Sequence, residues 1–214
     1  MNKLSLIALA SAALLAPVLS HAESTTINPA IAGSAASAKL DFTVVIPAVL
    51  YLRVGTGSGI AAANNTAVDS LTFTVPATNL GDSTAVAGVG GDLTAGAVTV
   101  RVFSNFGTNV SLNSSVSGQL SNGTDTIPWT QIGVVPAPLA STTAGYTNTG
   151  IAHPTFSATT GAGTAVSLAA GASKMVRQEG KWTFSYNNTS AYPAGTYGST
   201  VGNNGRVTYT ATQL

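Results

Sequence analysis

The sequence predicts an all-β domain of nine or ten short strands, arranged as a sandwich or a barrel. Three observations favour this class. Apolar residues recur at every second position in successive runs, which is the period of a strand with one buried face. Loops rich in Gly, Asn and Asp separate these runs, and 23 of the 214 residues are glycine. After residue 22, no stretch has the length and period of a convincing helix.

The alternation begins after residue 39, where Phe42, Val44 and Ile46 share one face of an extended segment. Pro47 interrupts this run, and a second strand piece follows it. A single domain over residues 39–214 is therefore expected. In chain order, the predicted strand runs cover residues 41–46, 49–52, 71–75, 98–102, 110–113, 166–168, 182–186 and 207–212.

A long loop, residues 136–163, separates two of these runs and is rich in Pro, Thr, Ala and Gly. Loops of this length without secondary structure are uncommon in compact domains. The loop is predicted to be either an excursion on the surface or an insertion that faces a partner.

The first 22 residues have the pattern of a secretory signal peptide. Lys3 supplies a positive charge, Leu4–Leu19 is apolar, and Ser20-His21-Ala22 places small residues where a signal peptidase cleaves. The apolar run is too short for a transmembrane anchor, which needs about 20 strongly apolar residues. We expect export through the periplasm to the cell surface or the medium, with no membrane span after cleavage.

The composition excludes several classes of function. Only 7% of the residues are charged, against about 25% in an average soluble domain. Seven basic and seven acidic residues remain after residue 22, so the net charge of the exported chain is near zero, which favours association. The basic residues are scattered, so no nucleic-acid partner is expected. The absence of Cys excludes disulfides and thiol chemistry.

The sequence offers little for catalysis, and we expect neither an enzyme nor a cofactor. His153 is the one histidine after residue 22 and lacks a G-x-S-x-G partner, so it is predicted to be an exposed loop residue. Asp82 and Asp92 each stand alone in a Gly-containing loop, which predicts turns and no metal site. Trp182 lies in an alternating run and is predicted to be in the core.

Residues 23–38 are small and polar and read as an N-terminal extension outside the core. Ile27, Pro29 and Ile31 stand at alternate positions, so an extended segment over residues 24–33 has one apolar face. Such a segment is suited to β-strand addition, in which a strand of one chain completes the sheet of the next. A disordered leader is the alternative, and Pro29 counts against a central strand position.

The stretch Tyr192-Pro193-Ala194-Gly195-Thr196-Tyr197, followed by Arg206–Thr212, resembles the ending of spore coat U-type domains and related archaic chaperone–usher pilins. In that family a P-x-G-x-Y segment leads into a terminal strand of alternating Thr, Val and Tyr. The opening run Asp41–Ile46, followed by Pro47, is similar too. The family commonly carries Cys near its first strands, which this chain lacks, and residues 136–163 have no matching segment.

The resemblance implies a single Ig-like, Greek-key antiparallel β-sandwich of about nine or ten strands with an extended N-terminal segment. It also implies a periplasmic chaperone, an outer-membrane usher and self-association into a fibre by donor-strand exchange. We therefore expect a structural subunit of a bacterial surface fibre, pilus or biofilm filament. The alternative is a secreted adhesin or carbohydrate-binding module that acts as a monomer, using loop 136–163 and Trp129.

Overall fold

The computed structural model describes residues 23–57 and 64–214, so the predicted signal peptide lies outside the described residues. The described chain divides into an N-terminal segment that ends at Ile46 and a compact unit from Pro47 to Leu214. Each is described by itself below.

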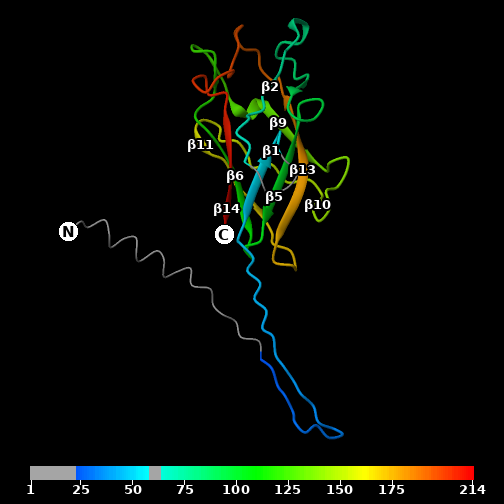
Figure 1. Ribbon diagram of the computed structural model, residues 1–214. Helices are drawn as coiled ribbons and strands as arrows, with labels where there is room; N and C mark the ends of the chain where they lie inside the picture. Colours follow the sequence, from blue (N-terminus) through cyan, green and yellow to red (C-terminus); the bar gives the residue numbers. More distant parts are fainter. Residues whose placement is uncertain (1–22, 58–63) are drawn as a thin grey trace, which may run out of the picture. The chain divides into compact units, whose positions relative to one another are not determined.

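The larger sheet of the compact unit is built around its longest strand, β13 (Val176–Tyr186). One side of β13 pairs with β5 (Ala97–Ser104), which in turn pairs with β1 (Leu50–Val54). These pairings are antiparallel (Figure 1). The other pairs of β13 are antiparallel with β9 (Ile132–Ala137) and β3 (Val86–Ala87) and parallel with β10 (Thr147–Asn148).

The second sheet is built around β6 (Val110–Val116). The C-terminal strand β14 (Val207–Gln213) pairs with β6 along its whole length. Strand β11 (Gly161–Ala162) and β14 both oppose Val116, so they lie on opposite edges of β6. The edge away from β14 also pairs with β12 (Val166–Leu168). All three pairings are antiparallel.

Two short ribbons complete the described unit. They join β2 (Leu71–Thr72) to β4 (Val89–Gly90) and β7 (Leu120–Ser121) to β8 (Thr126–Ile127). Within the described ranges, the helical elements are two three-residue 3-10 turns, Ala77–Asn79 and Trp129–Gln131. The all-β class predicted from the alternation is confirmed.

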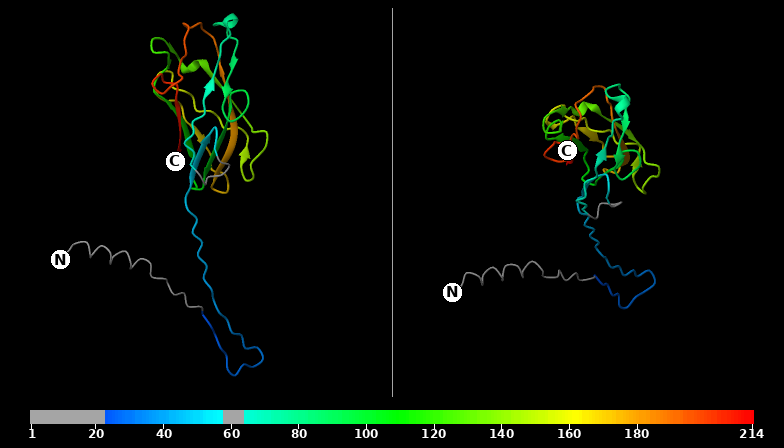
Figure 2. Two further views of the ribbon diagram at one scale, coloured as in Figure 1. Left: turned by 45° about the horizontal axis from the view of Figure 1, so that its top comes forward. Right: turned by 90° about the horizontal axis from the view of Figure 1, so that it is seen from above.

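Side chains from both sheets form one apolar core. The ribbons of the two sheets lie face to face in Figure 2. The inward faces of β5, β6 and β13 supply most of it, with Val100, Leu112 and Trp182 fully buried. Burying one such aliphatic side chain stabilises the fold by about 1.5–3 kcal/mol. The prediction that Trp182 packs in the core is confirmed, and its indole N–H donates to the carbonyl of Ile151 at 2.6 Å.

The expected strand over residues 41–46 is wrong for this chain, since no strand precedes Leu50 in the described residues. Its alternating apolar side chains are exposed, with Phe42 at 84% and Val44 at 82% of their full accessible surface. A strand needs a neighbour to receive its backbone hydrogen bonds, and this segment has none within the described chain. The run over 71–75 also shortens, to β2.

The long loop 136–163 is part of the fold rather than a surface excursion. It leaves β9 in the larger sheet and enters β11 in the second sheet, and Ile151 within it is 1% exposed. The Ser114 hydroxyl on β6 donates to the carbonyl of Thr155 at 2.9 Å. This loop therefore joins the two sheets through the core.

A buried ion pair holds the first half of that loop against the larger sheet. Arg101 on β5 donates from Nε and Nη2 to Oε2 of Glu179 on β13, at 2.9 and 2.7 Å. The Thr143 N–H donates to Glu179 Oε1, and the Arg101 guanidinium lies over the ring of Tyr146. Burial alone would raise the pKa of Glu179, but the Thr143 and Arg101 donors hold it below its usual value.

No helix among residues 23–57 and 64–214 combines the length and apolar character that crossing a membrane requires.

Replacing Arg101 with Ala is expected to lower the free energy of unfolding by about 3–5 kcal/mol, because it leaves Glu179 buried without its cation. Urea unfolding followed by intrinsic fluorescence measures the loss. The double variant Arg101→Met with Glu179→Leu should regain most of it. Arg177→Ala, an exposed cation on the same strand as Glu179, is the matched control and should cost less than about 1 kcal/mol. Equal losses for Arg101→Ala and Arg177→Ala would contradict the assignment.

Candidate functional site: a groove between two sheet edges

Strands β1 and β14 are edge strands, each with a hydrogen-bonded neighbour on one side among the described residues. On β1, the bond from Gly55 N–H to Thr99 O fixes which residues face β5. Since the bonding direction alternates along a strand, Leu50, Leu52 and Val54 direct their N–H and C=O groups away from β5.

The same reasoning applies to β14. The bond from Leu214 N–H to Asn109 O shows that the even-numbered residues face β6. Val207, Tyr209 and Ala211 therefore direct their backbone groups outward. The side chains of these residues point inward, and Tyr209 and Ala211 pack against the core. Within the described part of the chain, both strands thus offer backbone groups that no neighbouring strand pairs with, beside inward-facing apolar side chains.

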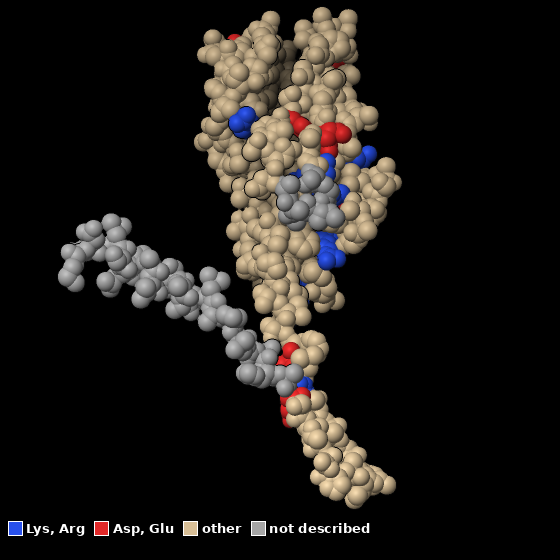
Figure 3. Space-filling model, viewed as in Figure 1, with Lys and Arg blue, Asp and Glu red and all other residues tan. Residues whose placement is uncertain are grey.

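An open groove of about 660 Å³ lies where β1 ends and β14 begins. The surface of the compact unit is hollowed between two lobes at one end (Figure 3). We name this groove the edge groove. Strand β1 contributes Val54, and β14 contributes Val207 and Tyr209. The remaining lining residues are Ala67, Val68, Asp69, Ser70, Leu71, Thr72, Phe73, Val98, Leu120, Trp129, Ile132, Phe156, Phe184, Tyr197, Gly198, Ser199, Thr200, Val201, Gly205 and Arg206.

The floor of the edge groove is apolar and aromatic. Val98 and Phe184 are core residues of the larger sheet, yet they line the groove. Trp129 and Phe156 lie beside them with ring centroids 5.1 Å apart. The two sheets therefore leave their shared core open along this line, which a strand of apolar side chains could close.

His153 lies beneath this floor, so its prediction as an exposed loop residue is wrong. Its ring packs edge-on against Trp182 at 4.5 Å and against Phe156 at 4.7 Å. Its Nε2 lies 2.8 Å from the hydroxyl of Tyr209. Burial lowers the pKa of His153 to about 4 and raises that of Tyr209, so both groups are neutral near pH 7.

Trp129, the residue proposed from sequence as a ligand platform, is 6% exposed. Its indole N–H donates to the carbonyl of Gly118 at 2.7 Å. Trp129 also lines the edge groove. Trp129 thus serves the floor of the groove, and it presents no face that could stack on a sugar at the surface.

The two loop carboxylates have structural partners. Asp82 accepts from Thr84 N–H and from the Asn79 side chain, as in an Asx turn, and the Thr84 N–H lowers its pKa. Asp92 accepts from Thr99 N–H and pairs with Arg53 at 2.9 Å. Among the described residues, no three His, Cys, Asp or Glu side chains lie close enough together to hold a metal ion.

The predicted donor residues lie in an N-terminal segment that bends back on itself. Ser34 N–H donates to Ile31 O, and the Thr25 hydroxyl donates to Ser37 O. Ile31 therefore lies at a turn and is 75% exposed, whereas Ile27 is 38% exposed. Pro29 lies in the bend before this turn.

A second candidate donor follows, which we name the 39–46 segment. Leu40, Phe42, Val44 and Ile46 occupy alternate positions, and each is more than two-thirds exposed. The residues are described without any turn, bend or strand. The alternation in the sequence predicts this segment as the first strand of the domain itself. A strand pattern indicates one buried face and does not identify the chain that buries it.

The comparisons with known proteins give no relatives: no family model, no curated protein and no solved structure matches this chain.

Acid is expected to destabilise the compact unit through His153. Its folded pKa of about 4 lies below the ordinary value of 6.5, so the unfolded chain binds a proton that the folded chain does not. Stability should be full above pH 6.5 and fall as the pH drops toward 4, by about 3 kcal/mol. Thermal unfolding between pH 4 and 7.5 measures this dependence.

His153→Gln is the control for that series, because Gln keeps an acceptor for the Tyr209 hydroxyl and does not titrate. The slope between pH 6.5 and 4 should flatten in this variant. An unchanged slope would assign the acid sensitivity to other groups.

Proposed function

We propose that this chain is a structural subunit of a bacterial surface fibre, pilus or biofilm filament, and that it polymerises by β-strand addition. In this proposal the two sheets form one Ig-like, Greek-key sandwich that lacks an edge strand. The missing strand is supplied by the N-terminal segment of another copy. The observation that carries the proposal is the coexistence, in one chain, of an open apolar groove and an exposed alternating segment.

The 39–46 segment matches the edge groove in chemistry and strand β14 in length. Its four alternate apolar side chains would face the aromatic floor, and burying each contributes about 1.5–3 kcal/mol. Eight extended residues span about 26 Å, close to the length of the seven-residue strand β14. Its backbone would pair with the outward N–H and C=O groups of Val207, Tyr209 and Ala211.

The segment 24–33, with Ile27, Pro29 and Ile31, stays a candidate donor. Three features favour the 39–46 segment over it. The turn at Ile31 interrupts the extended run, and Pro29 has no N–H to donate. The 39–46 segment also offers four large apolar side chains on one face, where the earlier segment offers two and a proline.

The surface chemistry agrees with a subunit that packs against copies of itself. Charged side chains are sparse on the face of the compact unit seen in Figure 3. A near-neutral exported chain has little electrostatic repulsion to oppose association. An open groove also exposes the core before assembly, so we propose a periplasmic chaperone that covers it and an outer-membrane usher that organises assembly.

We favour the fibre over the monomeric binding module because Trp129 is buried and loop 136–163 is integrated into the core. Those were the two features on which a carbohydrate site depended. We propose no catalytic role and no cofactor.

The decisive test uses the full exported chain, residues 23–214, with two Asp substitutions on the inward face of the 39–46 segment. Phe42→Asp with Val44→Asp should abolish filaments in negative-stain microscopy and leave a monomer in size exclusion. Charged side chains cannot enter the aromatic floor without a large desolvation cost. The circular dichroism of the compact unit should not change, because these residues lie outside it.

The matched control places the same charges on the opposite face, as Thr43→Asp with Val45→Asp, and should still assemble. Ile27→Asp with Ile31→Asp tests the earlier segment and should also assemble. Loss of filaments in the last variant alone would make residues 24–33 the donor. A wild-type chain that stays monomeric at high concentration, with no filaments on cells, would overturn the fibre proposal.

A further inference from the structure

Asn105, just after β5, holds the chain where the compact unit begins. Its side-chain Oδ1 accepts from Val49 N–H at 2.7 Å, and its Nδ2 donates to Pro47 O at 2.8 Å. Its own backbone N–H donates to Val49 O at 3.3 Å. One residue thus makes three hydrogen bonds to residues 47–49, which contain no turn.

The sequence around these residues could otherwise form a hairpin. Two alternating apolar runs flank Pro47-Ala48, and a hairpin there would lay the 39–46 segment along the outward edge of β1 in its own chain. Pro suits the second position of a type I turn, where its fixed φ is already correct. Self-closure of this kind would fill the chain's own groove and end polymerisation.

The three bonds of Asn105 oppose that hairpin. A type I turn over residues 46–49 needs Val49 N–H to donate to Ile46 O, but this N–H is held by Asn105. Val49 also directs its carbonyl toward Asn105, on the β5 side of the strand, away from the edge where the hairpin would form. The type I′ and II′ turns that two-residue hairpins prefer are excluded as well, because they need a positive φ at the position of Pro47, which proline cannot adopt.

We propose that Asn105 is a positioning residue that commits the 39–46 segment to the groove of a second copy of this chain. The proposal rests on the proposed function, since it presumes that this segment is the donor. Asn105 does not touch the edge groove, because it is not among the lining residues. It acts through residues 47–49, which it keeps extended. Insertion of the 39–46 segment into its own groove is then less favourable than insertion into the groove of another copy.

The absence of Cys allows a clean cross-linking test on the full exported chain. Val207→Cys marks the groove, and a second Cys replaces Leu40, Phe42, Val44 or Ile46 in turn. Oxidation gives interchain disulfides, seen as a ladder on a non-reducing gel, if donation is between copies. It gives a disulfide-closed monomer if the segment enters its own groove. Only interchain products depend on protein concentration.

With Asn105 present, the ladder should dominate. Asn105→Ala removes two side-chain hydrogen bonds that oppose the hairpin, each worth roughly fivefold in an equilibrium constant, so the closed monomer should increase roughly 25-fold relative to the ladder. Asn105→Asp keeps the acceptor for Val49 N–H and loses the donor to Pro47 O, so it should give an intermediate ratio even if the Ala variant folds poorly.

Asn109→Ala is the matched control, because it removes another bond from an Asn side chain to backbone, that of Ala170 N–H, without touching residues 47–49. Its ratio should equal that of the parent chain. A ladder unchanged in both Asn105 variants would overturn the role of Asn105 and leave the fibre intact. So would a loss of the ladder with no closed monomer. A closed monomer already dominant with Asn105 present would overturn the fibre proposal itself.

Discussion

The unpaired backbone of two sheet edges is the constraint on which the rest of this structure depends. Strands β5, β6 and β13 have neighbours on both sides, whereas β1 and β14 have one each among the described residues. The end of β1 and the start of β14 line the same opening into the core, so one added strand could pair with exposed backbone there and also cover the aromatic floor. The need for hydrogen-bond partners and the need to bury apolar surface therefore point to the same missing element.

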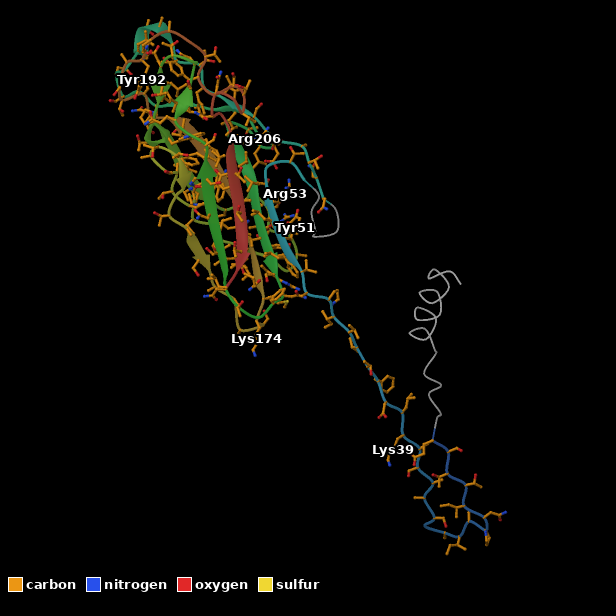
Figure 4. All side chains as sticks on the ribbon, turned by 90° about the vertical axis from the view of Figure 1, so that its left-hand side faces the viewer. Lys39, Tyr51, Arg53, Lys174, Tyr192 and Arg206 are labelled. Carbon is orange, nitrogen blue, oxygen red and sulfur yellow. The ribbon has the colours of Figure 1, made fainter. Side chains whose placement is uncertain are left out.

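Strand β14 also lacks the devices by which monomeric proteins protect their edge strands. Natural edge strands commonly carry Lys, Pro or a bulge that discourages pairing with another chain. The exposed residues of β14 are Thr208, Thr210 and Thr212, which are uncharged and favour strands. Arg53 on β1 is engaged with Asp92, and Arg206 precedes β14 rather than lying within it (Figure 4). An edge so unprotected fits a chain that uses strand pairing between copies.

Period-two alternation predicted the all-β class and most of the long strands, because each side chain's face depends on local geometry alone. The same signal could not reveal that residues 41–46 lack a partner, since a neighbouring strand is supplied by distant residues or by another molecule. The position of His153 was also beyond the sequence. Its surroundings, Trp182 and Tyr209, come from two strands far along the chain, and its neighbour Pro154 is typical of an exposed loop. Contacts between residues distant in the sequence determine both the lack of a strand partner for residues 41–46 and the burial of His153.

Each copy of the chain carries both the segment and the groove, so polymerisation joins two different surfaces. Such heterologous contacts build open fibres only when the chain of subunits does not close into a ring or onto a single molecule. The shortest closure is within one chain, where the local concentration of the segment exceeds any concentration between chains. A fibre subunit of this kind therefore needs a feature that penalises self-insertion more than it penalises insertion into a neighbour. In the proposed fibre, such a penalty would act at residues 47–49, because they link the segment to β1. The bonds that Asn105 makes to these residues would meet this requirement without occupying the groove.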